Sequence, residues 1–339
     1  MRAFIVDRYG TTNGVRIGEM PEPELREDDV LVHVHAAGIN QLDSKIKRGE
    51  FKRILPYRPP FVLGHDVAGV VVRVGPRVRQ FKSGDEVYAR PDDFRIGAFA
   101  EYIAIKQDSL AFKPKTLTME EAASIPLVGL TAWQALIEKA NLKKDQKVFI
   151  QAGSGGVGTF AIQLAKHVGA TVATTTSAAN VDLVRSLGAD IVIDYTKEDF
   201  EHVLRDYDVV LHSLDRVALE KSLRVLKPGG QLISISGPPD AAFARSIRAS
   251  WVLRMIMGVL SYSIRAKAKS REVHYAFLFM RANGDQLTRD HGSHRRRNHS
   301  ASPGSGLSVS IDERGHGLRR SRTRKGQSRR LDDVNARVR

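Results

Sequence analysis

A cluster of glycines near the middle of the chain carries the clearest chemical signal in the sequence. Its spacing fits both G-x-G-x-x-G and A-x-x-G-x-x-G, and the residues concerned are Ala152, Gly153, Gly155, Gly156, Val157 and Gly158. Glycines at this spacing permit a tight turn and a close backbone approach to a pyrophosphate. A helix that starts there directs its first amides at the phosphates. The pattern indicates dinucleotide binding, and the alternative is a purely structural glycine-rich turn.

The segments around this loop favour the dinucleotide interpretation. A short apolar strand is predicted over 147–151, a helix over 159–168 and a second strand over 171–176. A strand before the glycines, a helix after them and a second strand about twenty residues on form the context that the motif requires.

The end of the second predicted strand bears on the choice of cofactor. NAD sites usually place an acid there for the ribose 2′-hydroxyl. This strand runs from Thr174 to Ser177 through hydroxyl residues, and the first acid is Asp182. A carboxylate would repel a 2′-phosphate, whereas hydroxyls can donate to it, so we expect NADP(H) with Ser177 as a contact. Arg185 could add positive charge, although an exposed helical arginine is the plainer interpretation.

The chain divides into two patterns. Up to about residue 125 it is β-rich, with alternating strands predicted over 30–35, 67–74 and 85–89 between Gly/Pro turns, which is typical of a small barrel-like domain. Helical and strand segments then alternate, which predicts a doubly wound parallel sheet. Helices are predicted over 120–140, 181–187 and 219–226, and further strands over 191–194, 208–212 and 231–236.

Composition excludes several classes of site. The chain of 339 residues has no Cys, which removes disulfides and Cys-ligated zinc or iron–sulfur sites. The N-terminus is strand-like and no targeting segment is expected before it, so the predicted location is cytoplasmic. The longest apolar run, 251–262, is interrupted by Arg254 and too short to span a bilayer, so no integral membrane protein is expected. This run and the basic residues after it could shape a substrate mouth, form a dimer contact or touch a membrane, or be an ordinary partly buried helix.

The net charge of +15 is concentrated at the C-terminal end. Residues 286–339 contain 14 Lys+Arg and 5 Asp+Glu, a net charge of +9. Their few apolar residues predict a disordered tail. Because most of the basicity lies there, nucleic acid is not an expected partner of the rest of the chain, and binding through the tail is kept only as a third hypothesis.

Further segments spread over residues 1–285 resemble one family when taken in order. These segments are Gly38–Lys45, Gly64–Val71, Gly84–Tyr88, Ala122–Leu127, Leu130–Trp133, Asp194–Thr196 and Leu226–Gly230. The set resembles the zinc-independent quinone oxidoreductase branch of the medium-chain dehydrogenase/reductase superfamily, in particular plant alkenal/one oxidoreductases and chloroplast-envelope quinone oxidoreductase homologues.

The resemblance implies an α/β fold, with a GroES-like β-barrel-type catalytic domain, a Rossmann domain and an active site in the cleft between them. The expected boundaries are 1–125 for the catalytic domain, 126–265 for the NADP-binding domain, 266–287 for a return to the catalytic domain and 288–339 for the tail. It also implies residue roles: Asn40 near the nicotinamide, Lys45 and Thr131 near its ribose, and Tyr195 near the 2′-phosphate. Asp43 has two interpretations, an active-site role or a turn or helix cap.

The chemistry is expected to need no metal. Zinc enzymes of the superfamily place Cys in the segment that here contains Asn40 and Asp43, and only His65 of the ligand set remains. One histidine does not make a tetrahedral site, so His65 is interpreted as structural or cleft-lining. Reduction of a quinone or of the C=C bond of an α,β-unsaturated carbonyl needs no Lewis acid, and hydrogen-bond donors would stabilise the developing oxyanion.

The resemblance stops abruptly after Leu287. Both His294–Ala301 and Arg314–Gln327 can be written in codons that spell family-like segments when shifted forward by one base. We therefore hypothesise a frameshift near residue 288, which would make the arginine clusters accidental. The leading function is an NADPH-dependent quinone or enone reductase, and the alternative is a catalytically impaired NADPH-binding protein. A homodimer is left open.

Overall fold

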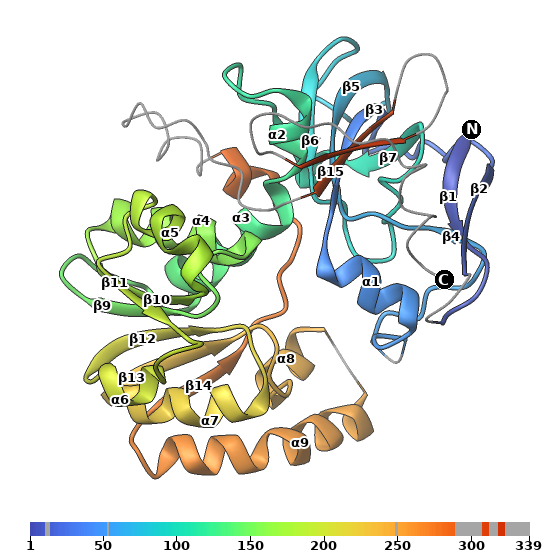
Figure 1. Cartoon of the computed structure of the whole chain (residues 1–339). Helices are drawn as coiled ribbons and strands as arrows, with labels where there is room; N and C mark the ends of the chain where they lie inside the picture. The colour runs from blue at the N-terminus through green and yellow to red at the C-terminus, as the bar shows by residue number, and fades with distance from the viewer. Residues whose placement is uncertain (11–13, 53, 248–249, 289–306, 312–317, 323–339) are drawn as a thin grey trace, which may run out of the picture. The chain divides into compact units, whose positions relative to one another are not determined.

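The computed structural model describes the chain except for residues 11–13, 53, 248–249, 289–306, 312–317 and 323–339 (Figure 1). The chain forms two compact units, Met1–Leu130 with Arg281–Arg339, and Thr131–Met280. The chain passes from one unit to the other at 130/131 and at 280/281. Both positions come later than the expected boundaries at 125/126 and 265/266.

The first unit is built from antiparallel sheets and matches the β-rich interpretation of its sequence. A small sheet has the strand order β2-β1-β4, and a larger one runs β16-β15-β3-β5-β6-β8, with β7 also paired to β3. The strands of the N-terminal part are β1 (Arg2–Val6), β2 (Val15–Glu19), β3 (Asp29–Ile39), β4 (Phe61–Val62), β5 (Asp66–Val74), β6 (Glu86–Ala89), β7 (Tyr102–Lys106) and β8 (Leu110–Phe112). Two helices accompany them, α1 (Gln41–Arg48) and α2 (Met119–Ala123).

The predicted alternation describes the burial of β3 only between Val32 and His35, because Leu31 and the residues from Ala36 to Gly38 are buried as well. Val30, Val32 and Val34 are buried and share one core cluster with Val67 and Val71 of β5, as expected for strands whose alternate side chains face the same side. His33 and His35, on the other face of the strand, are only half-buried. Burial of these valines fixes which face of β3 points inward.

The C-terminal tail contains two strands, β15 (Leu307–Ile311) and β16 (Leu318–Arg322), which pair with each other. The strand β15 also pairs antiparallel with β3, from Leu307 opposite Ile39 to Ser310 opposite Ala36. Here the structure differs from the expectation of a tail without regular structure. The physical reason is that backbone groups at a strand edge can pair with an extended segment of almost any composition. Residues 286–288 of the tail are also described, and its remaining residues, 289–306, 312–317 and 323–339, lie outside the described part of the chain.

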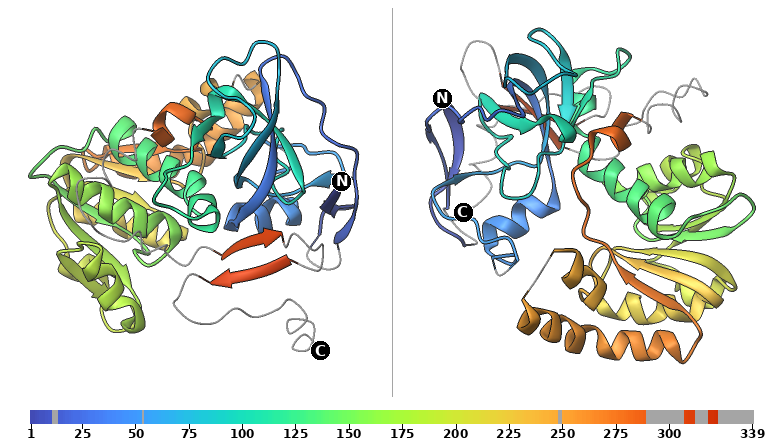
Figure 2. Two further views of the ribbon diagram at one scale, coloured as in Figure 1. Left: turned by 90° about the horizontal axis from the view of Figure 1, so that it is seen from above. Right: turned by 180° about the vertical axis from the view of Figure 1, so that it is seen from behind.

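The second unit has one parallel sheet of order β11-β10-β9-β12-β13-β14 (Figures 1 and 2). In chain order this is 3-2-1-4-5-6, the arrangement of a doubly wound dinucleotide-binding sheet. The strands are β9 (Lys147–Ile150), β10 (Thr171–Thr176), β11 (Ile191–Asp194), β12 (Tyr207–His212), β13 (Leu226–Ser234) and β14 (His274–Phe277). The helices are α4 (Gly156–Val168), α5 (Val181–Ser186), α6 (Phe200–Val203), α7 (Arg216–Val225), α8 (Ala241–Ser246) and α9 (Trp251–Lys269).

The single helix predicted over 120–140 is divided in the structure. After α2 ends at Ala123, α3 covers Pro126–Trp133 and a π-helix covers Gln134–Lys139. The break falls before Pro126 because a proline has no backbone N–H and disfavours the α conformation of the residue before it. Among the described residues, no helix is both long enough and apolar enough to cross a bilayer.

Candidate functional site

The register of β3 and β5 brings together Asn40 and Asp43, two of the residues that were predicted to be functional, with His65 and Asp66. Gly38, at the end of β3, lies opposite Asp66, the first residue of β5. A Cβ atom at Gly38 would overlap the Ala123 carbonyl oxygen and come within 2.9 Å of the Asp66 Cβ. The absence of a side chain at Gly38 therefore lets α2 and β5 approach the point where β3 leads into Asn40 and α1.

Asp43 joins this helix start to the neighbouring strand. Its Oδ2 accepts a hydrogen bond from the Asn40 backbone N–H at 2.7 Å, and its Oδ1 lies 2.6 Å from His65 Nδ1. Asp43 and His65 are both buried. Because the carboxylate only accepts hydrogen bonds, His65 carries its proton on Nδ1. Asp43 therefore acts as a cap at the start of α1, and the same side chain also orients His65.

The second nitrogen of His65 is unusual. Nε2 is buried and has no hydrogen-bond partner in the described part of the chain. Buried polar atoms without partners are rare in folded proteins. With Nδ1 held by Asp43, Nε2 is the ring atom left for a further interaction.

Asn40 makes the other connection of this cluster. Its Nδ2 donates to Asp66 Oδ2 at 2.9 Å, and Asp66 Oδ1 accepts the backbone N–H of Leu127 at 2.8 Å. Burial raises the pKa of Asp66 to about 8, although the hydrogen bond from Asn40 and the charge of Arg90 act in the opposite direction. Asp66 is therefore a carboxyl group that takes up a proton near neutral pH.

Arg90 is a member of this neighbourhood that sequence reasoning missed. It is 1% exposed and follows β6, whose Ala89 is paired with Val67 of β5, so it lies next to Asp66 across the sheet. Its Nη2 contacts Asp93 at 2.5 Å and its Nη1 donates to the Pro91 carbonyl at 2.9 Å. The available signal was an arginine directly after a predicted strand, but its burial depends on a register that the sequence does not specify.

Lys45 stands apart from the Asn40, Asp43, His65 and Asp66 cluster. It lies on α1 one turn after the capped start and is half-buried. In the part of the chain that the structure describes, its ammonium group has no hydrogen-bond or ion-pair partner. Lys45 is thus a cation whose charge is free for a ligand.

In the second unit, the glycine loop lies between β9 and α4, as its sequence predicts. Gly155 is the N-cap residue of α4, and its N–H donates to the Ala152 carbonyl at 2.9 Å. A Cβ at Gly158 would overlap that same carbonyl oxygen and lie 2.7 Å from the Gly153 Cα. A Cβ at Gly153 would overlap Thr174 Oγ1. The loop is thus folded closely onto both α4 and β10, while Gly156 and Val157, which begin the helix, remain partly exposed.

The threonines of β10 fasten this loop, a role that sequence reasoning did not assign to them. Thr175 Oγ1 accepts the Ala152 N–H at 3.2 Å, and the Thr175 carbonyl accepts the Gly153 N–H at 2.9 Å. Thr176 Oγ1 donates to Ser154 Oγ at 3.0 Å. The hydroxyl-rich strand end therefore fixes the loop, and the end of β10 itself bears no carboxylate, although Asp194 of β11 is paired with Thr176.

The residues predicted to lie near a 2′-phosphate are neighbours. Thr176 is paired with Asp194, so Ser177 and Tyr195 both follow the carboxyl ends of adjacent parallel strands. Ser177 Oγ accepts from Asn180 Nδ2 at 3.1 Å, and the Tyr195 side chain is 64% exposed. Arg185 is exposed on α5. Thr131, which is buried in α3, begins the second unit and does not belong to this group.

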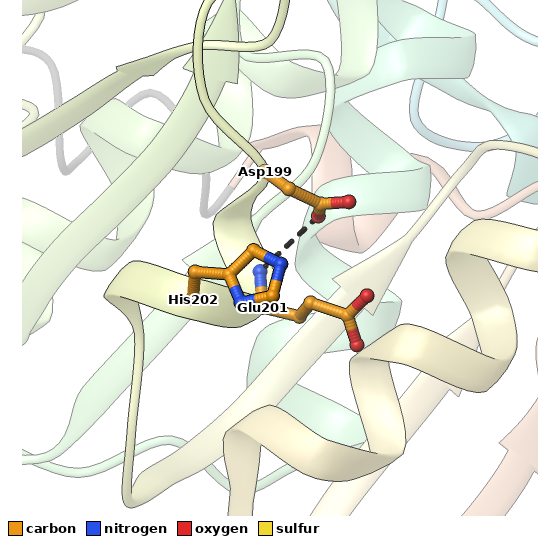
Figure 3. A group of neighbouring side chains, drawn as sticks. All are labelled: Asp199, Glu201 and His202. Carbon is orange, nitrogen blue, oxygen red and sulfur yellow. Dashed lines mark hydrogen bonds between the residues drawn. The ribbon is translucent and has the colours of Figure 1, made fainter.

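One other cluster has the composition of a metal site. Among the described residues, Asp199, Glu201 and His202 form the group whose ligand atoms lie within 4.8 Å of one another (Figure 3). Asp199 Oδ1 caps α6 by accepting the Glu201 N–H at 3.3 Å. Lys221 contacts both carboxylates, and Arg224 contacts Glu201. Because two cations already balance the two carboxylates, ion pairing explains this cluster.

Comparison with known proteins gives this geometry its context. The description "Alcohol dehydrogenase GroES-like domain" matches residues 26–115, and "Zinc-binding dehydrogenase" matches residues 156–269. The chain is 35% identical to a chloroplastic quinone-oxidoreductase homolog of Spinacia oleracea over 251 residues, which are 71% of this chain and 76% of that protein. The chain belongs to the quinone and enone reductase branch of the medium-chain dehydrogenase/reductase superfamily.

Two further similarities refine this assignment within the quinone and enone reductase branch. The 2-methylene-furan-3-one reductase of Solanum lycopersicum is 41% identical over 255 residues, or 72% of this chain, but the chain spans only 65% of that relative's length. The NADPH complex of Escherichia coli quinone oxidoreductase superposes with a TM-score of 0.70 at 26% identity and covers 86% of each chain. The expected fold class, a GroES-like domain plus a Rossmann domain, is confirmed.

The buried carboxyl group of Asp66 predicts a pH dependence of stability. Its pKa is raised from 3.8 to about 8 in the folded state, so its contribution is complete below the unfolded pKa and is lost as the pH rises through the folded pKa. We expect the free energy of unfolding to fall between about pH 4 and about pH 8 more steeply in the wild type than in Asp66→Asn. Urea unfolding across this range measures it. Exposed Asp182→Asn should keep the wild-type profile, and parallel profiles for wild type and Asp66→Asn would contradict the prediction.

The close approach of the glycine loop to β10 predicts a difference between two glycines. Gly153→Ala forces a methyl group into the buried Thr174 side chain, so we expect it to lower the free energy of unfolding by about 1–3 kcal/mol. Gly155 has φ −78° and ψ 164° and its nearest neighbour would lie 3.2 Å from a Cβ. Gly155→Ala should therefore change stability by less than about 1 kcal/mol. Equal losses in urea unfolding would show that the loop is not held against Thr174.

Proposed function

We propose that this chain is an NADPH-dependent oxidoreductase that reduces a quinone or the C=C bond of an α,β-unsaturated carbonyl, and that it does so without zinc. The observation that carries the proposal is a glycine loop fastened to a strand end that bears hydroxyls and no carboxylate. The activity for which the tomato relative is named, reduction of a methylene-furanone, and the NADPH bound in the Escherichia coli enzyme support it.

The residues of the second unit fit the pyrophosphate and the 2′-phosphate of NADPH. The backbone at Gly153, Gly155 and Gly156 and the first amides of α4, from Val157 and Gly158, would bind the pyrophosphate. A Cβ at Gly155 would meet only the Ala152 carbonyl within 4 Å, so space is open on this side of the loop. Ser177 and Tyr195 would contact the 2′-phosphate, and Thr131 the nicotinamide ribose. No aspartate or glutamate occurs between the end of β10 and Asp182 to repel that phosphate.

The residues of the first unit are assigned to the reaction itself. A bound nicotinamide cofactor supplies hydride to the electron-poor carbon of the substrate. Asn40, held by Asp66, and Lys45, which has no partner in the described part of the chain, would orient the reacting groups and stabilise the oxyanion that forms. Asp43 acts as a positioning residue because it both caps α1 and holds His65.

The residues available as metal ligands support the proposal that the enzyme works without zinc. The sequence contains no cysteine, and the Nδ1 of His65 is already bonded to Asp43. One free imidazole nitrogen is too few for a tetrahedral site. A cytoplasmic location, the lack of a nucleic-acid partner and the homodimer stay predictions.

An assay of NADPH oxidation with a panel of quinones and 2-alkenals tests the proposal. We expect turnover with members of one of these classes, a preference for NADPH over NADH, and activity that survives prolonged dialysis against a chelator. Isothermal titration with NADPH runs in parallel. Binding with no turnover on any acceptor would support the alternative, an NADPH-binding protein that has lost catalysis, and absence of binding would refute both.

Ser177 provides a sharper test of cofactor choice. Ser177→Asp places a carboxylate beside the proposed 2′-phosphate position and offers an acceptor to a ribose 2′-hydroxyl. We expect NADPH to bind about tenfold more weakly, a change of about 1.4 kcal/mol, and NADH to bind more tightly. Ser186→Asp adds the same charge at an exposed position of α5 and is the matched control. If both variants keep the wild-type ratio of NADPH to NADH affinity, Ser177 is not a determinant.

A further inference from the structure

The helix α9 has two apolar faces, of which only one is packed. Met257, Ser261, Ile264 and Ala268 are its buried residues, and their spacing of four, three and four positions places them on one side of the helix. This side contacts α7, α8 and β14 of the same unit. Figure 1 shows α9 along the outside of the unit, beside α7. Within this unit, α9 is therefore held by its buried side alone.

The opposite side carries large apolar side chains that are exposed. Trp251, Met255, Val259 and Tyr262 follow one another at spacings of four, four and three, and they are 74%, 56%, 70% and 68% exposed. We call these four residues the outer stripe of α9. Val252, Ile256 and Leu260 extend it, so seven of the eighteen exposed large hydrophobic residues in the described chain lie on this one helix. Contiguous exposed apolar surface of this kind marks an interaction site.

The charged side chains of α9 itself all have one sign. Residues 241–271 contain seven Lys and Arg and no Asp or Glu. Lys267 pairs with Glu220 of α7, whereas Arg265 and Lys269 have no partner in the part of the chain that the structure describes. An apolar stripe that begins with a tryptophan and ends among cations matches the interface of a membrane with anionic headgroups.

We propose that the outer stripe of α9 lies in the surface plane of a membrane that contains anionic lipids. The apolar side chains enter the boundary between headgroups and acyl chains, and Arg265 and Lys269 contact the headgroups. A second copy of this chain fits the surface less well, because a symmetric contact would bring the same cations together. This inference stands on α9 alone and does not depend on the proposed catalytic function.

Cosedimentation with lipid vesicles tests the proposal on the full chain. We expect binding to vesicles of phosphatidylcholine with phosphatidylglycerol, and much weaker binding to phosphatidylcholine alone. The double variant Met255→Glu/Val259→Glu should weaken partitioning about tenfold or more. Val217→Glu changes a residue of α7 that is 64% exposed and is the matched control, since it adds a carboxylate outside the stripe. The control should bind as the wild type does.

Charge and fluorescence separate the two parts of the surface. Arg265→Glu/Lys269→Glu should weaken binding to anionic vesicles about tenfold or more. The wild type should also lose affinity between about 0.05 M and about 0.5 M salt. Trp251 emission should shift to shorter wavelength when the vesicles are added. Trp251→Phe should still sediment but lose that shift, because the remaining Trp133 is half-buried in α3.

Two outcomes would overturn the proposal. One is that the Met255→Glu/Val259→Glu variant binds vesicles as tightly as the wild type does, or that neither protein binds them. The other is sedimentation velocity that shows a wild-type dimer which this variant converts to a monomer, since the stripe would then join two copies. The NADPH affinity of every variant is measured alongside. It should stay unchanged, so that a failure of the membrane proposal is distinguished from a failure of the proposed function.

Discussion

The antiparallel pairing of β3 with β5 is the constraint on which the first unit depends. It sets Gly38 opposite Asp66, and from that register follow the contacts of Asn40 with Asp66 and of Asp43 with His65. A slip of one residue would turn each side chain of the strand to the other face. The buried carboxylates would then lose partners that offset the cost of removing them from water. The core valines and the polar cluster are therefore specified by one register.

The second unit depends on close backbone packing around its glycine loop. Its glycine loop is close enough to β10 for threonine hydroxyls to hold its backbone, and close enough to α4 for only a hydrogen atom to fit at Gly158. The strand order places this loop where neighbouring connections leave the sheet in opposite directions, between β9 and β12. A cofactor would thus meet a surface that is rigid before it arrives, which lowers the entropic cost of binding.

Local signals in the sequence were sufficient for the second unit and insufficient for the cluster in the first. The glycine spacing, the threonine strand and the helix–strand alternation concern neighbours along the chain, and the structure contains each of these elements. Composition predicted one helix over 120–140, but the structure has a break before Pro126. The burial of Arg90 and the pairing of Asp43 with His65 arise from contacts between segments more than twenty residues apart, where the partner depends on register. The pairing of β15 depends on a free edge, which the composition of the tail does not reveal.

That edge has a consequence for how the chain behaves in a crowded solution. The strand β3 is covered on one side by β7 along Asp29–His33 and by β15 along Ala36–Ile39. Without β15, the last residues of β3 would present unpaired N–H and C=O groups directly before Asn40, and such an edge is a template for strands of other chains. The tail segment thus covers this stretch of β3, and among the described residues β16 becomes the terminal strand of the sheet. Because the hydrogen bonds of β15 come from the backbone, almost any extended sequence could serve, and coverage of the β3 edge depends on the presence of a strand more than on its residues.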